Sequence, residues 1–188
     1  MMDSMAIPGA GSETAEEALV LAAKRGDREA YSLLVERYRR LAFDYAYAYF
    51  RNRDDADDAT QEAFIRAFLA LRELRGSWPA WMMRILRNVC TDLARKKRVR
   101  RHELIDESWL DQAPTPETTA LSEDRRRQVA RALADLPETL RVPVAMHFLS
   151  RRTYREVALA LGMRESTIVG RISRGLRMLR ERLAEEEL

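Results

Sequence analysis

Cysteine is almost absent from the sequence, and long apolar runs are missing. The 188 residues contain one cysteine, Cys90, so a disulfide within the chain is impossible and a reducing, cytoplasmic environment is expected. No stretch approaches the ~18 consecutive apolar residues of a membrane-spanning helix, so membrane insertion is not expected. Residues 1–12 have no basic segment followed by an apolar one, which argues against a secretory signal and predicts a loose tail over residues 1–13.

Glycine and proline are also scarce, with 7 and 6 residues respectively. Helix formers such as alanine, leucine, arginine and glutamate dominate, and 46% of the residues are hydrophobic. Few turn residues and many helix formers predict an all-α fold, and the apolar share is sufficient for packed cores. A chain of this length can form one mid-sized domain or two small ones.

The residue patterns that mark enzymes and metal sites are missing. The sequence has no glycine-rich phosphate loop and no pairing of serine or cysteine with histidine that suggests a nucleophile. Its two histidines, His102 and His147, have no second ligand at a suitable spacing, and Cys90 lies in an apolar helical stripe that favours the core. We therefore expect no catalytic activity, no metal and no cofactor.

Charge is distributed unevenly, although the formal net charge is only +3. A basic run at 95–101 is followed by seven acidic residues and no basic one over 103–124, and residues 141–182 then hold ten arginines against three glutamates. This order indicates two nucleic-acid-facing modules joined by an acidic connector. Each run taken alone is equally compatible with a solvated helix face.

The first half of the chain predicts amphipathic helices. Thr14-x-x-Glu17 resembles a capping box, which places a helix start near residue 14, and Gly26-Asp27 interrupts that helix. Apolar residues recur at helical spacing over 30–49 and again over 59–71, the second time behind an acidic cluster at 54–58 that suits a helix N-terminus. Residues 75–79 predict a short loop. An apolar stripe that starts at Trp81 predicts a helix that continues into the basic run.

The second half predicts a helix-turn-helix. Two prolines among acids mark a linker over 102–122, and a helical module follows from about residue 122 with a break at Leu136-Pro137. Thr153-x-x-Glu156 is another capping box, Gly162 suits a helix C-terminus, and a new helix is expected from about residue 165. Its apolar positions 168, 172, 176, 179 and 183 face inward, with arginines on a neighbouring face. This favours DNA binding over an ordinary helical hairpin with a basic surface.

Motifs in both halves together resemble the extracytoplasmic-function (ECF) sigma factors of bacterial RNA polymerase. The resemblance covers residues 24–184 in the family's order, and its motifs are Gly26-Asp27-x-x-Ala30-Tyr31-x-x-Leu34-Val35-x-x-Tyr38, Ala56-Asp57-Asp58-Ala59-Thr60-Gln61-Glu62-Ala63-Phe64, Trp81-Met82-x-Arg84-Ile85-x-x-Asn88, Leu136-Pro137-x-x-Leu140-Arg141, Tyr154-Arg155-Glu156-Val157-Ala158-x-x-Leu161-Gly162 and Ser166-Thr167-Ile168-Val169-Gly170-Arg171-Ile172-x-Arg174-Gly175. It implies a domain at 14–101 that binds polymerase and the −10 promoter element, a linker at 102–122, and a domain at 123–188 that binds the −35 element.

The resemblance also implies three groups of site residues. The group expected to bind core polymerase is Asp58, Gln61 and Glu62. The group expected at the −10 element has Trp78 as a stacking platform and Asn88 as a reader of a base edge, together with Ser77, Arg84, Arg87, Arg95 and Lys96. The group expected at the −35 element is Arg164, Ser166, Thr167, Arg171, Arg174 and Arg177. Trp81 is expected in the core.

The implied function is that of an alternative sigma factor that directs polymerase to promoters and helps melt the −10 region. Its expected partners are core RNA polymerase, promoter DNA and an anti-sigma factor. The acidic linker is expected to act as a tether, or to enter the RNA path of the polymerase as the family's linker does. Val169 and Gly170 depart from the family's usual residues, which leaves the −35 sequence preference open. The alternative is a free-standing helix-turn-helix regulator that binds duplex DNA without polymerase.

Overall fold

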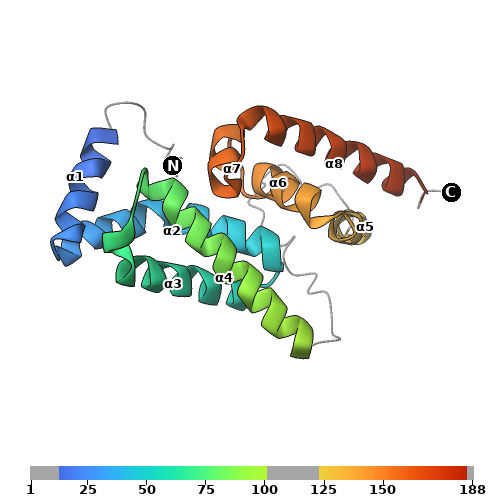
Figure 1. Cartoon of the computed structure of the whole chain (residues 1–188). Coiled ribbons are helices and arrows are strands. Elements are labelled where there is room, and N and C mark those ends of the chain that lie inside the picture. Colours follow the sequence, from blue (N-terminus) through green and yellow to red (C-terminus); the bar gives the residue numbers. More distant parts are fainter. Residues whose placement is uncertain (1–12, 101–122, 186–188) are drawn as a thin grey trace.

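A computed structural model describes residues 13–100 and 123–185 of the chain. Within these ranges every regular element is helical (Figure 1), which confirms the predicted all-α fold: α1 (Glu13–Lys24), α2 (Arg28–Phe50), α3 (Arg53–Leu69), the 3-10 turn η1 (Leu71–Glu73), α4 (Trp78–Arg100), α5 (Glu123–Ala134), α6 (Glu138–Phe148), α7 (Tyr154–Leu161) and α8 (Glu165–Glu185). Residues 1–12 of the predicted tail and the predicted linker lie outside the described residues. We call α1 to α4 the first module and α5 to α8 the second.

Polar caps determine where α2 and α3 begin. The Asp27 carboxylate accepts hydrogen bonds from the backbone N–H groups of Glu29 and Ala30, at 3.0 and 3.1 Å, at the start of α2. Asn52 caps α3 by accepting from the N–H of Asp55 at 3.0 Å. The sequence predicts that the acidic cluster at 54–58 begins α3, whereas the helix begins at Arg53 and its cap is the side-chain amide of Asn52.

Small residues let the helices of the first module approach closely. Helix α2 packs against α1, α3 and α4, and α3 also packs against α4. The contact faces of α2 and α3 carry fully buried alanines, namely Ala42, Ala46, Ala56, Ala59, Ala63 and Ala67. Alanine has the highest helix propensity and little bulk, so these faces favour both helix formation and tight packing.

The second module contains the predicted helix-turn-helix. The Thr153 hydroxyl accepts from the N–H of Glu156 at 3.2 Å, and the Glu156 carboxylate accepts from the N–H of Thr153 at 2.8 Å, so the capping box of α7 is confirmed. Gly162 ends α7 in the left-handed conformation with φ +65°, and α8 begins at the expected residue 165. Ile168 and Ile172 of α8 are buried in the core.

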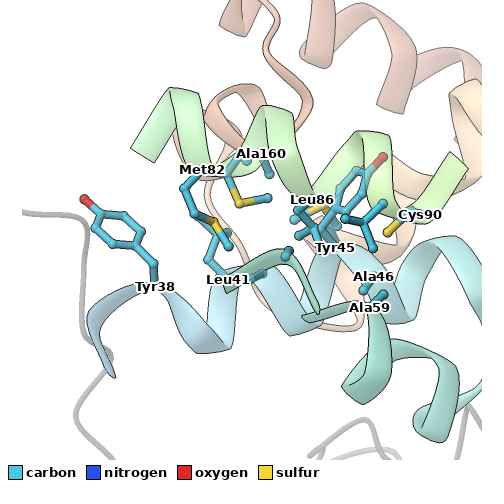
Figure 2. Close-up of a cluster of buried hydrophobic side chains, with 14 of the residues drawn as sticks. Tyr38, Leu41, Tyr45, Ala46, Ala59, Met82, Leu86, Cys90 and Ala160 are labelled. Atoms are coloured by element: carbon cyan, nitrogen blue, oxygen red, sulfur yellow. The ribbon is translucent and has the colours of Figure 1, made fainter. Parts of the chain in front are cut away.

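The two modules pack against each other. Helix α2 contacts α6 and α7, and α4 contacts α7. Ala160 of α7 is fully buried beside Met82 and Leu86 of α4 and Tyr45 of α2, and Figure 2 shows these side chains in one cluster. The apolar cores of the two modules are thus continuous across the boundary. Sequence patterns left the contact between the modules open.

Candidate protein and nucleic-acid interfaces

One face of α3 changes from acidic to apolar along the helix. Asp58 and Gln61 are exposed, and Glu62 is partly covered because its Oε1 pairs with Nε of Arg66 at 2.7 Å. Two exposed apolar side chains continue the same helical face, since Ile65 is four residues beyond Gln61 and Leu69 is four beyond Ile65.

These apolar residues were not predicted as site residues. Leu69 is 77% exposed and Ile65 is 47% exposed, and Phe68 beside them is 44% exposed although the sequence pattern placed it inward. The signal that could have found them is the spacing from Gln61 along the helix. An exposed apolar group next to acids suits a protein partner more than solvent.

The structure contradicts the prediction that Trp78 is a stacking platform. Trp78 is the first residue of α4, so the predicted loop at 75–79 is shorter than expected. Its indole is 1% exposed and packs edge-on against Tyr31, with ring centroids 5.8 Å apart, and at a tilt against Trp81 at 5.9 Å. It therefore belongs to the core of the first module. Trp81 is 7% exposed, which confirms its expected core position.

A polar face of α4 carries most of the residues predicted for the −10 element. Arg84, Asn88 and Arg95 are exposed and follow one another at helical spacing, and the exposed Lys96 lies beside Arg95. Ser77 is exposed immediately before the helix. The structure thus gathers one amide, one hydroxyl and several cations along one side of α4.

Arg87 differs from the other cations of α4. Its Nη1 donates a 2.7 Å hydrogen bond to the carbonyl oxygen of Ala160 in α7, and burial lowers the pKa of its guanidinium. A Cβ placed on Gly162 would lie 2.8 Å from Nη2 of Arg87, which shows how closely the guanidinium approaches the turn between α7 and α8. In this structure Arg87 joins the modules instead of facing solvent.

The first turns of α8 present polar side chains to solvent. Arg164, immediately before the helix, and Ser166 and Thr167 within its first turn are exposed, as are Arg174 and Arg177 further along. Exposed hydroxyls and cations around a helix N-terminus can bind phosphate or a base edge. Val169 is 41% exposed on the same part of the helix.

Arg171 is turned toward the protein. Pro143 lies inside α6 and has no backbone N–H, so the carbonyl of Thr139, four residues earlier, loses its helical donor. Nη1 of Arg171 lies 3.5 Å from that carbonyl oxygen. The predicted −35 contact of Arg171 thus competes with a contact between α8 and α6.

Neither a metal cluster nor a membrane-spanning helix is found in the described ranges. Within 13–100 and 123–185 no three histidine, cysteine, aspartate or glutamate side chains are grouped so that they could hold a metal ion. In the same ranges no helix combines the length and apolarity needed to cross a membrane.

Family models match both modules. The model described as Sigma-70 region 2 matches residues 34–100, and the model described as Sigma-70, region 4 matches residues 126–179. The first match includes the faces of α3 and α4, and the second includes the helix-turn-helix.

Two solved structures share the fold. CnrH in complex with the cytosolic domain of CnrY aligns with a TM-score of 0.61 and 23% identity over 91% of this chain and 98% of that one. The sigma factor RpoE of Bartonella quintana, in complex with the anti-sigma factor NepR, aligns with a TM-score of 0.55 and 21% identity over 82% of this chain and 96% of that one.

Curated relatives extend the match along the chain. The ECF RNA polymerase sigma-E factor of Escherichia coli is 30% identical over 171 residues, which cover 85% of this chain and 89% of that protein. The ECF sigma factor SigE of Mycolicibacterium smegmatis is 31% identical over 157 residues, or 81% of this chain, and the match spans 61% of that longer relative. The chain therefore belongs to the ECF sigma factors of RNA polymerase.

Proposed function

We propose that this sigma factor binds core RNA polymerase through α3, reads the −10 element with α4 and the −35 element with α8, and helps to melt the −10 region. The observation that carries the proposal is the separation of its surfaces. An acidic and apolar face lies on α3, whereas exposed cations and polar groups lie on α4 and at the start of α8. One protein partner and two segments of nucleic acid suit these three surfaces.

The α3 face has the chemistry of a protein interface. The carboxylates of Asp58 and Glu62 suit a basic partner surface, and charge complementarity of this kind favours specific and fast association. Ile65 and Leu69 supply the apolar area that such a contact buries. We include them, with Asp58, Gln61 and Glu62, in the surface that binds core polymerase.

The α4 face has the chemistry needed to hold an unpaired strand. The Asn88 amide can donate to and accept from a base edge, while Arg84, Arg95 and Lys96 can neutralise phosphates. Ser77 adds a hydroxyl at the start of the helix. Base stacking is not assigned to Trp78, because its ring is in the core.

The start of α8 has the chemistry needed to read duplex DNA. A recognition helix inserts its N-terminal residues into the major groove, and Arg164, Ser166 and Thr167 occupy that end of α8. Arg174 and Arg177 lie further along the helix, where they can contact the DNA backbone. Arg171 can join them once it leaves the Thr139 carbonyl.

We also propose that an anti-sigma factor binds this chain, as CnrY and NepR bind their sigma factors. The chain acts in the cytoplasm, where polymerase and DNA are, and it contributes no catalytic residue, metal or cofactor. A free-standing regulator is disfavoured by family membership, and it would bind duplex promoter DNA well without polymerase.

Transcription by reconstituted core polymerase over a pool of genomic fragments tests the proposal. With this protein added, sequenced transcript starts should share two spaced elements upstream. Asn88→Ala should abolish these starts while polymerase still binds, and Ser32→Ala, which removes an exposed hydroxyl on α2, should leave them unchanged. Starts that share no element, or full transcription by Asn88→Ala, would overturn the promoter assignment.

A binding assay tests the polymerase surface separately. Ile65→Lys with Leu69→Lys should raise the Kd for core polymerase by at least about tenfold, because both changes place charge in an apolar contact. Leu21→Lys on α1 is the matched control, since Leu21 is also exposed, at 58%. Equal affinity of the double variant and the control would remove α3 from the proposed interface.

A further inference from the structure

A buried ion cluster joins the two modules. Arg152, in the turn between α6 and α7, donates from Nε and Nη2 to Oδ2 of Asp44 in α2 at 2.7 and 2.6 Å. The side chain of Asp44 is 3% exposed and that of Arg152 is 14% exposed. Nη1 of Arg152 also donates to Oε1 of Glu156 at 2.8 Å. Burial acts to lower the pKa of Arg152, but the adjacent carboxylates of Asp44 and Glu156 together raise it.

The surroundings of the cluster make it a specific contact. Nε of Arg40 donates to Oδ1 of Asp44 at 3.1 Å, so both carboxylate oxygens have partners. Glu156 is at the same time the third residue of α7 and completes the capping box with Thr153, so the position of Arg152 is tied to the start of the helix-turn-helix. A second polar contact crosses the same boundary, from Arg87 to the Ala160 carbonyl.

The boundary also contains an unfavourable pair. Arg51 at the end of α2 and Arg141 of α6 lie close enough that burial and then the charge of Arg51 lower the pKa of Arg141. The Nε atoms of both arginines are buried, and no residue of the described ranges accepts a hydrogen bond from them. A buried ion pair gains little net free energy beyond its own desolvation cost, and the two nearby cations add no attraction, so these polar contacts stabilise the boundary only modestly.

We propose that Asp44, Arg152 and Glu156, with Arg87 on Ala160, form a latch that holds the free chain closed. In the closed form Arg87 of the −10 face touches the turn that leads into the −35 recognition helix. Two DNA elements that lie at least one helical turn, about 34 Å, apart cannot be bound at the same time by two protein surfaces that touch each other. The closed chain therefore has to open before it can span a promoter.

The polymerase-binding face remains accessible in this closed form. Gln61 and Ile65 are exposed on α3, which Figure 1 shows on the opposite side of the first module from α8. Polymerase can consequently bind the closed chain first, and opening can follow as DNA is engaged. This order of events rests on the proposed function, whereas the latch itself is a property of the free chain.

Distances between two spin labels in the free protein test the latch. The background carries Cys90→Ala, with labels at Glu73→Cys on η1 and Arg180→Cys on α8, both exposed positions. The parent chain should give one narrow distance. Arg152→Met or Asp44→Asn should add a longer distance and raise the ratio of open to closed chains by more than about tenfold, because each removes one of the two buried charges that meet across the boundary and leaves the other without its partner in the opposite module.

Two further variants separate the latch from general damage. Arg182→Met removes an exposed ion pair with Asp135 inside the second module and should leave the distance unchanged. Asp44→Leu with Arg152→Met should restore the closed distance, since an apolar pair can replace a buried ion pair. Circular dichroism of every variant checks that its helix content equals that of the parent.

The outcomes distinguish the latch from the proposed function. A broad or long distance in the parent, or an unchanged distance in Arg152→Met, would overturn the latch. So would an open population in Asp44→Leu with Arg152→Met that equals the sum of the effects of the two single changes. These measurements contain no polymerase or DNA, so their failure leaves the transcription assay unaffected. Conversely, a failed transcription assay leaves the distances of the free chain as they are.

Discussion

Gly175 of α8 packs so closely against Val144 of α6 that a Cβ placed on the glycine would lie 2.7 Å from Val144 Cγ2. The carbonyl oxygen of Leu140 would lie 3.6 Å from the same Cβ. Gly170, one and a half turns earlier in α8, has no atom within 4 Å of its Cβ position. Both glycines lower the helix propensity of α8 by the same amount, but only Gly175 is required by packing.

Alanine substitution should separate these two roles. Gly175→Ala should lower the free energy of unfolding by about 1–3 kcal/mol, because overpacking against buried Val144 outweighs the gain in helix propensity. Gly170→Ala should raise it by about 0.5–1 kcal/mol, because a methyl group there meets only solvent. Urea unfolding followed by circular dichroism measures both, and a stabilised Gly175→Ala would contradict the packing argument.

Trp78 should behave as a core residue when it is replaced. Trp78→Ala should cost about 3–5 kcal/mol, because it leaves a large cavity between Tyr31 and Trp81. Loss of transcription by this variant would then report unfolding and not a missing DNA contact. Trp78→Phe, which keeps most of the apolar volume, should retain both stability and promoter melting, as thermal unfolding and a transcription assay on the same sample would reveal.

Most of the fold was predictable because its signals are local. The capping box of Thr153 and Glu156 and the left-handed Gly162 depend on neighbours a few residues away, and each was found where the sequence pattern placed it. The apolar spacing of α4 and α8 predicted their buried faces for the same reason.

The rest could not be predicted because it depends on distant parts of the chain. Arg152 meets Asp44 across 108 positions, and neither residue belongs to a recognisable motif. Arg87 has the spacing of a surface cation, but α7 lies over it and supplies a carbonyl. The nearby Gly76 and Pro79 predict a turn around Trp78, but proline is also tolerated in the first turn of a helix, and Trp78 begins α4.

Stability should fall as the pH rises above about 8.5, the ordinary pKa of a thiol. Burial raises the pKa of Cys90 to about 12, so between these values the thiol ionises only in the unfolded chain. The unfolded state then binds fewer protons than the folded state, and the free energy of unfolding decreases with pH. Burial also raises the pKa of Tyr31, Tyr38 and Tyr45, which extends the loss beyond pH 10.

Urea unfolding at pH 8, 9 and 10 measures this dependence. The parent should lose up to about 1.4 kcal/mol per pH unit for each such group. Cys90→Ala lowers stability at every pH through its cavity, but it should remove the thiol's part of the slope between pH 8.5 and 10. An identical slope in the parent and in Cys90→Ala would show that the thiol ionises equally in both states.

Arg84 and Arg87 are close on α4 but should respond differently to replacement by alanine. Arg84 is exposed, so Arg84→Ala should weaken binding of promoter DNA by the polymerase complex. It should also reduce the slope of log K for DNA binding against log salt concentration by about one, which corresponds to one phosphate contact. It should leave the free chain closed. Arg87→Ala removes the hydrogen bond to Ala160, so it should also increase the open population of the free chain.

Two measurements on each variant distinguish the roles. A salt titration of DNA binding by the polymerase complex should show a reduced slope for both, because an opened chain frees Arg87 to contact phosphate. The spin-label distance in the free chain should change for Arg87→Ala alone. If Arg84→Ala opened the free chain as well, the contact between the modules would depend on the total charge of α4. The hydrogen bond from Arg87 to α7 would then not be the contact that keeps the chain closed.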